Sequence, residues 1–165
     1  MADIKAGFQF IDHRIKRLEI KNDFSDLLGR INYQLSLEVA DTPATEENEN
    51  GDYVGYVSLI VKAKGESPEL DGQSISIVLE VEGGFFACKN DVPLEAFNEM
   101  LQINGLTTMY TIARCIIISV SAQCCPNGQV RIPMLNMMEV RKAIDEAEEA
   151  ESRPEPSSTS SPENE

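Results

Sequence analysis

QSISIVLEVEGGFFACKND, residues 73–91, starts as a strand and runs into two glycines followed by two phenylalanines. One parity of this stretch is purely apolar and consists of Ile75, Ile77, Leu79 and Val81. Alternation with a period of two predicts a strand that buries one face. Because successive strand residues point to opposite faces, Phe85 and Phe86 cannot enter the same core. One of them faces the core, and the other needs a cover or a partner.

The glycine pair, Gly83 and Gly84, lies directly before these aromatic residues. Glycine inside a strand marks a bulge, the end of pairing, or a place where another backbone approaches closely. The pair therefore has two interpretations. It only marks a bulge or the end of strand pairing, which we call the punctuation interpretation, or it forms the floor of a groove that an extended peptide enters beside one phenylalanine. The sequence leaves both interpretations open.

Three further segments have the character of strands. In residues 7–20 the apolar parity changes between Ile15 and Leu18, which predicts a bulge or bend near Lys16–Arg17. Residues 31–39 alternate strictly and predict a half-buried antiparallel strand, whereas residues 53–64 are apolar on both parities. Four strands joined by polar loops predict an antiparallel meander.

The second half of the chain has helical periodicity. Residues 93–103 have apolar side chains at helical spacing, and Asn104–Gly105 is a stop signal. A second helix over about residues 107–123 is expected to bury a stripe made of Met109, Ile112, Ala113, Ile116 and Val120. A short third helix begins near residue 139. We therefore expect one α+β domain over residues 1–150, ordered from about 7 to 142.

The C-terminal residues 151–165 are rich in Pro, Ser and Glu, which is typical of a disordered tail. The whole chain of 165 residues has a formal net charge of −14, which disfavours binding to nucleic acids and to anionic membranes. We find no apolar run of the roughly 20 residues that a membrane span needs, and no secretory signal. These features predict a cytoplasmic protein without stable membrane insertion.

Motifs for catalysis and metal binding are missing from the sequence. It contains no Gly-rich phosphate loop, paired-histidine metal motif or nucleophile elbow, so we expect no enzyme activity, cofactor or metal. The cysteines, Cys88, Cys115, Cys124 and Cys125, are interpreted as free thiols whose role the sequence does not define.

Four sequence blocks together carry a family resemblance: FQFIDHRI (8–15), LEVEGGFF (79–86), IAR (112–114) and IPMLN (132–136). In their order and spacing the chain resembles the SecB family of bacterial protein-export chaperones over about residues 8–142. The stretch GLTTMYTIAR lacks the prolines common in the family at this place, and the chain has no tryptophan. Details of subunit packing and of the groove are therefore not carried over from the family.

The resemblance implies a four-stranded antiparallel sheet with two main helices on one face, plus a short C-terminal helix. It also implies a homotetramer, built as a dimer of dimers, that holds unfolded precursor proteins and delivers them to the motor SecA without covalent chemistry. The residues that match family positions contacting SecA are Glu19, Asp23, Val78 and Glu80. The residues assigned to a client groove are Gly83, Gly84, Phe85 and Phe86, together with Tyr56.

Two other functions stay open at this stage. A SecB-like chaperone can be dedicated to the antitoxin of a toxin–antitoxin system, in which case no contact with SecA is needed. A small-ligand binder or thioesterase-like protein would instead have a closed pocket with a carboxylate or histidine on its central helix. The second predicted helix has only Arg114 as a charged residue.

Overall fold

The computed structural model describes residues 7–24, 31–46, 51–67, 69, 73–125 and 129–151. Four strands come first along the chain: β1 (Phe8–Asn22), β2 (Asn32–Glu46), β3 (Tyr53–Glu66) and β4 (Ser74–Ala87). The chain divides into two compact units, Met1–Met134 and Leu135–Glu165. The second unit contains the helix α3 (Met137–Glu151), whose first turn is capped by Asn136, because the Asn136 Oδ1 atom accepts a hydrogen bond from the Met138 amide.

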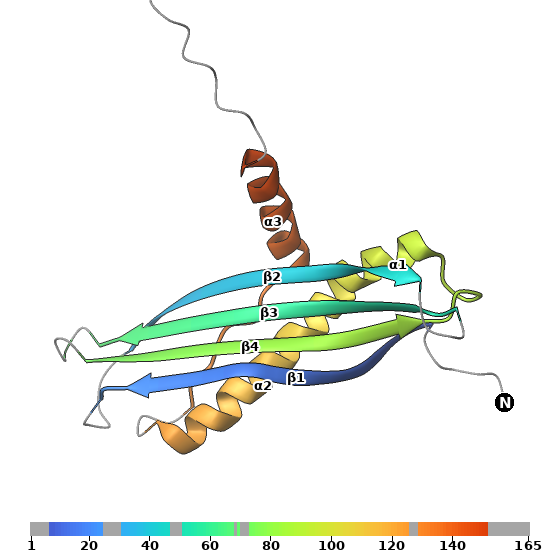
Figure 1. Ribbon diagram of the computed structural model, residues 1–165. Helices are drawn as coiled ribbons and strands as arrows, with labels where there is room; N and C mark the ends of the chain where they lie inside the picture. The colour runs from blue at the N-terminus through green and yellow to red at the C-terminus, as the bar shows by residue number, and fades with distance from the viewer. Residues whose placement is uncertain are drawn as a thin grey trace, which may run out of the picture. The chain divides into compact units, whose positions relative to one another are not determined.

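The four strands form one antiparallel sheet in the order β1-β4-β3-β2 (Figure 1). The prediction of a simple meander is therefore wrong for β1, which pairs with β4 at the opposite edge from β2. Cross-strand charges give a physical reason. Arg14 and Arg17 of β1 lie opposite Glu82 and Glu80 of β4, and opposite charges facing each other across a ladder stabilise the pairing.

Burial alternates strictly along the two central strands. The odd-numbered residues of β3 and β4 are buried, and the even-numbered ones are half-buried or exposed. We call the odd face of these strands the inner face, and the opposite face the outer face. Ile75, Ile77, Leu79 and Val81 all lie on the inner face, as the alternation in the sequence predicts.

Two irregularities interrupt β1. Its register against β4 shifts between Ile15 and Arg17, which confirms the predicted bulge, and again between Phe10 and Asp12. Each extra residue moves the following side chains to the other face of the strand. The strand can thereby place Phe8 and Ile15 on the inner face although their parities differ.

The helical part of the first unit is continuous. It consists of α1 (Leu94–Met100), the π-helical turn η1 (Leu101–Gly105) and α2 (Leu106–Cys124). The expected stop at Asn104–Gly105 is wrong, because Gly105 keeps right-handed helical angles (φ −60°, ψ −51°). A Cβ atom on Gly105 would lie 3.1 Å from Cγ2 of Val57, so this glycine serves a close approach of the helix to β3.

Threonine side chains provide partners for two carbonyls of the π turn. The Thr107 hydroxyl donates to the Ile103 carbonyl (2.7 Å), and the Thr108 hydroxyl donates to the Asn104 carbonyl (2.8 Å). Thr111 makes the same kind of bond to the Thr107 carbonyl within α2, so these bonds are not special to the π turn. Bonds of this kind often bend a helix.

α2 runs obliquely across the inner face of the sheet (Figure 1). Its buried residues are Leu106, Met109, Tyr110, Ala113, Ile117 and Ser121. The predicted stripe was only partly right, because Ile112, Ile116 and Val120 are merely half-buried. Within the described residues, the helical run Leu94–Cys124 is long and apolar enough to cross a membrane by length and composition alone. A core helix packed on a sheet passes the same test.

Candidate binding surfaces

One long helix cannot cover four strands. Strands lie about 4.8 Å apart, so the two edge strands are separated by roughly 14 Å. A helix with its side chains is about 10 Å wide. The inner face is accordingly left partly uncovered at both edges. Ile15 on β1 is 47% exposed and Tyr33 on β2 is 43% exposed, although both lie on the inner face.

The inner row of β2 consists of Tyr33, Leu35, Leu37 and Val39. Its aliphatic members are half-buried, whereas their partners on β3, such as Val61 and Leu59, are fully buried. Burial, and to a smaller extent the nearby Cys125 thiol, raises the pKa of Tyr33, so its hydroxyl stays neutral at physiological pH. The alternation in the sequence identified this row as apolar. Only the width of the sheet relative to the helix shows that it stays accessible.

Gly83 lies where the sheet and α2 approach each other closely. A Cβ atom at Gly83 would overlap the Sδ atom of Met109 on α2. The neighbouring Gly84 faces outward, where a Cβ atom would lie 3.4 Å from Cε1 of Tyr56, an ordinary contact. Pairing does not end at the two glycines, because β4 remains paired with both neighbours beyond them. A bulge is present, since the register against β1 shifts between Phe10, which lies opposite Phe85, and Asp12, which lies opposite Gly84. The punctuation interpretation is therefore confirmed for the bulge and wrong for the end of pairing. A methionine of the chain itself fills the space at Gly83.

The two phenylalanines lie on opposite faces, as the sequence predicts. Phe85 is 0% exposed, and its ring lies 5.2 Å from that of Phe8 and 5.4 Å from that of Phe10. Phe86 is half-buried on the outer face, between Gln9 of β1 and Val54 of β3 in the register. The structure thus divides the sequence-predicted groove set. Gly83 and Phe85 belong to the core, whereas Tyr56, Gly84 and Phe86 face outward.

The outer face has a hollow of about 570 Å³ over Gly84. Its apolar lining includes Ile11, which is 54% exposed, and Tyr56, which is 47% exposed. Arg14 and Glu82 are the charged residues at its edge that also pair with each other. The hollow is open to solvent, and its carboxylates, Asp12 and Glu82, and its histidine, His13, lie on strands. It therefore differs from a closed pocket with such a group on a central helix, which a thioesterase-like protein would have.

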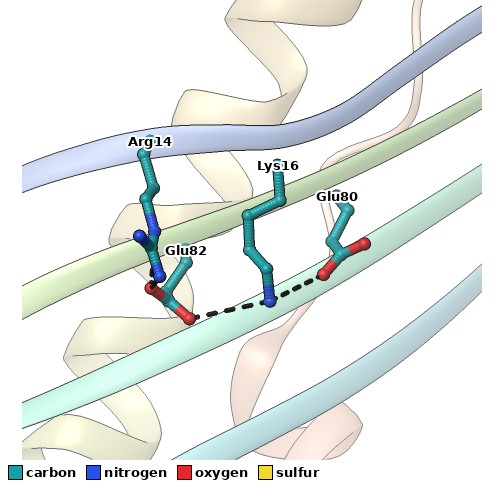
Figure 2. A network of polar contacts seen from close by, with 4 residues as sticks. All are labelled: Arg14, Lys16, Glu80 and Glu82. Carbon is teal, nitrogen blue, oxygen red and sulfur yellow. Dashed lines mark hydrogen bonds and ion pairs between the residues drawn. The ribbon is translucent and has the colours of Figure 1, made fainter.

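A network of ion pairs joins four residues of β1 and β4 (Figure 2), of which Arg14 and Glu82 also line this hollow. Arg14 Nη2 lies 2.6 Å from Glu82 Oε1, and Lys16 Nζ lies 2.8 Å from Glu80 Oε1 and 3.8 Å from Glu82 Oε2. The hydrogen bond and charge of Glu80 raise the pKa of Lys16. Because Lys16 is the bulge residue of β1, it projects beside Arg14 toward the same row of acids on β4 (Figure 2).

Three of the residues predicted to contact SecA lie together on the outer face. Glu19 is opposite Val78 in the register, and Glu80 lies two residues further along β4. Asp23 lies beyond the end of β1, where its amide donates to the Ser74 carbonyl. Glu19 pairs with Arg17 as Glu80 pairs with Lys16, so this part of the outer face is charge-paired and not a purely acidic surface.

Residues 129–134 form an extended segment along α2, which we call the strap, and its contacts with α2 were not predicted from the sequence. The Tyr110 hydroxyl donates to the Pro133 carbonyl (2.8 Å), and Arg114 Nε donates to the Ile132 carbonyl (3.2 Å). The Val130 amide donates to the Ser121 hydroxyl oxygen (2.8 Å). The strap covers Tyr110 and Ser121, which explains why these two polar residues are buried on α2.

The four cysteines are free thiols, and burial raises the pKa of Cys125. Among the residues that the structure describes, no group of three or more His, Cys, Asp or Glu side chains could hold a metal ion. The described surfaces therefore consist of apolar rows, an open hollow and ion pairs.

The sequence matches no protein-family model and, at a significant level, no curated protein. Among solved structures it is similar to the Mycobacterium tuberculosis Rv1957 SecB-like chaperone in complex with a ChAD peptide from the Rv1956 HigA1 antitoxin. The two chains are 14% identical with a TM-score of 0.57, and the match covers 78% of this chain and 91% of that one. The predicted α+β architecture is thereby confirmed, and the chain has the fold of a SecB-like chaperone.

Proposed function

We propose that this protein is a holdase, a chaperone of the SecB-like type that binds unfolded protein segments in the cytoplasm without covalent chemistry. The observation that carries the proposal is the inner row of β2. In this row, apolar side chains at alternate positions remain accessible beside a single covering helix. The similarity of the fold to a chaperone supports the same conclusion.

An extended client segment is suited to such a row. Each apolar side chain that it buries contributes roughly 25 cal/mol per Å² removed from water, whatever the sequence of the client. Each apolar contact along the row contributes little binding free energy, and the contributions add up along the strand. A surface of this kind discriminates unfolded from folded chains, because only unfolded chains present several apolar residues in a line.

Tyr33→Ser is expected to weaken the binding of an unfolded client about tenfold, because one large aromatic contact worth about 1–2 kcal/mol is lost. The measurement is fluorescence anisotropy with a labelled precursor that cannot refold, together with suppression of its aggregation. Phe86→Ala is the matched change on the outer face. A larger loss for Phe86→Ala would move the client to the sequence-predicted residues Tyr56, Gly84 and Phe86.

We further propose that the protein self-associates, as the resemblance to the family implies, into a homotetramer. The exposed inner-face residues of the edge strand β1, Phe10 and Ile15, are the apolar surface available for such a contact. The outer face then remains accessible to a partner such as SecA, with Glu19, Asp23, Val78 and Glu80 as the proposed contacts.

Glu80→Lys is expected to weaken SecA binding by about three- to tenfold at low salt while client binding is kept, because a reversed rim charge mainly slows association with a basic partner. Glu66→Lys is the matched control, since Glu66 is also an ion-paired strand residue with an exposed side chain. Titration by light scattering or calorimetry at two salt concentrations gives the comparison. Equal affinities for both variants would contradict the assignment to SecA.

A chaperone for a single antitoxin is the second candidate, because the similar structure holds a peptide from an antitoxin. The two candidates predict different competition results. A general export chaperone binds several unrelated unfolded chains with similar affinity. A dedicated one binds one antitoxin segment and is not displaced from it by other unfolded chains.

A further inference from the structure

The hydrogen bonds between the strap and α2 go to the backbone of the strap. Tyr110, Arg114 and Ser121 project from one side of the helix and contact two carbonyls and one amide of the strap, respectively. None of these three hydrogen bonds involves a side chain of the strap. Contacts to the main chain are available to almost any extended peptide, which is how sheet-edge binders recognise varied sequences.

The side chains of the strap alternate in burial like those of a strand. Val130 and Ile132 are buried, whereas Arg131 and Pro133 are exposed, and the alternation ends at Met134, which is 81% exposed. The side of α2 under the strap therefore offers two apolar positions spaced two residues apart, in addition to its hydrogen-bonding groups. An extended segment with apolar residues at alternate positions would satisfy the same sites.

The free energy of detaching the strap from α2 depends on what takes its place. Leaving the Tyr110 and Arg114 donors without their carbonyls is unfavourable, because buried polar groups that lose partners carry a desolvation penalty. Burial raises the pKa of Tyr110, so its hydroxyl stays a donor at physiological pH. A peptide that restores the same hydrogen bonds removes most of this penalty. Replacement of the strap by such a peptide is therefore favoured over detachment of the strap alone.

We propose that the strap side of α2 is a second client groove, which the chain's own residues 129–134 fill until an extended, alternately apolar client segment displaces them. This inference rests on the proposed holdase function, and it names the segment class that the protein binds. The strap then acts as an internal competitor. Clients that present several apolar stretches bind this groove in addition to the inner row of β2.

Hydrogen–deuterium exchange on the full chain tests the displacement directly. The probe is a permanently unfolded, reduced and alkylated protein, whose binding is followed in parallel by anisotropy. We expect exchange within the strap, including the Val130 amide that is bonded to Ser121, to accelerate at least about tenfold when the probe is bound. Unchanged protection of the strap with the probe bound would overturn the proposal.

Strap variants provide an independent test. Ile132→Ser loosens the competitor without changing α2, so client affinity should rise about three- to tenfold. Arg131→Ser, at an exposed position of the same strap, should leave it unchanged. Adding Tyr110→Phe to Ile132→Ser keeps the ring but removes the donor, and should lower client affinity again. An affinity that does not rise in Ile132→Ser, in a chain whose circular dichroism is native, contradicts the proposal.

A labelled peptide, QVRIPMLN, copied from residues 129–136, separates this inference from the holdase proposal. It should bind the Ile132→Ser chain in trans and bind the wild-type chain at least about fivefold more weakly. If no unfolded protein binds but the peptide does, the holdase proposal fails and the groove stands. If unfolded proteins bind but the peptide does not, the groove under the strap is excluded.

Discussion

Phe85→Ala should lower the free energy of unfolding by about 3–5 kcal/mol, the range for a fully buried phenylalanine whose site cannot collapse. Phe85 is completely buried and lies in ring contact with Phe8 and Phe10. Removing its ring leaves a cavity at the place where the first strand meets the centre of the sheet. Urea denaturation followed by circular dichroism gives the difference in stability.

Phe86→Ala is the matched comparison for this prediction. Phe86 is the next residue on the same strand, but it lies half-buried on the outer face. Its truncation should cost about 1 kcal/mol, because much of its surface is already in contact with water. The prediction for Phe85 fails if the two variants lose equal stability, or if Phe86→Ala is the more damaging.

Gly83→Val is expected to destabilise the fold by about 3 kcal/mol, near the upper end of the usual cost of overpacking. The new side chain would occupy the space of the Met109 sulfur, and Met109 is itself fully buried. Gly84→Val adds the same atoms one residue later, beside Tyr56 and Ile11, which are exposed and free to move aside. It should change stability by less than about 0.5 kcal/mol.

A second substitution tests the cause of the Gly83 effect. Shortening the opposing side chain with Met109→Ala should recover part of the stability in the Gly83→Val background, although Met109→Ala alone is destabilising. The coupling energy from the double-mutant cycle should exceed about 1 kcal/mol, as expected for residues in direct contact. Additive effects of the two changes would show that backbone strain, and not the contact with Met109, causes the loss.

The strands and their faces could be predicted from the sequence, because alternation is a local property. Ile77, Leu79 and Val81 needed only their neighbours in the chain to be assigned to the core. The bulge near Lys16 could also be predicted, since a change of apolar parity within one strand requires it. The order of the strands could not be predicted, because the pairing of Arg14 and Arg17 with β4 joins residues far apart in the chain.

The candidate site could be predicted only in part. The sequence showed that Phe85 and Phe86 must separate, but not which of them enters the core, because a bulge at Gly83–Gly84 could have changed the buried parity after Val81. The strap contacts at Tyr110 and Ser121 have no local signal, since each depends on a backbone group that lies on a later segment. The exposure of Tyr33 follows from a sheet that is wider than the helix covering it. This difference becomes known only when the number of strands is compared with the number of helices packed on them.

The π turn before α2 determines which side of the following helix faces the sheet. Buried residues recur at every fourth position, from Phe97 through Leu101, Gly105, Met109, Ala113 and Ile117. A spacing of four advances by about 40° per step around an α-helix of 3.6 residues per turn, so the buried side winds around the helix axis. The wider turn at Leu101–Gly105 takes up part of that rotation. Deleting one residue there would turn every later side chain by about 100° and carry Met109 away from Gly83. The orientation of α2 about its own axis is therefore fixed by the 5 residues of this turn.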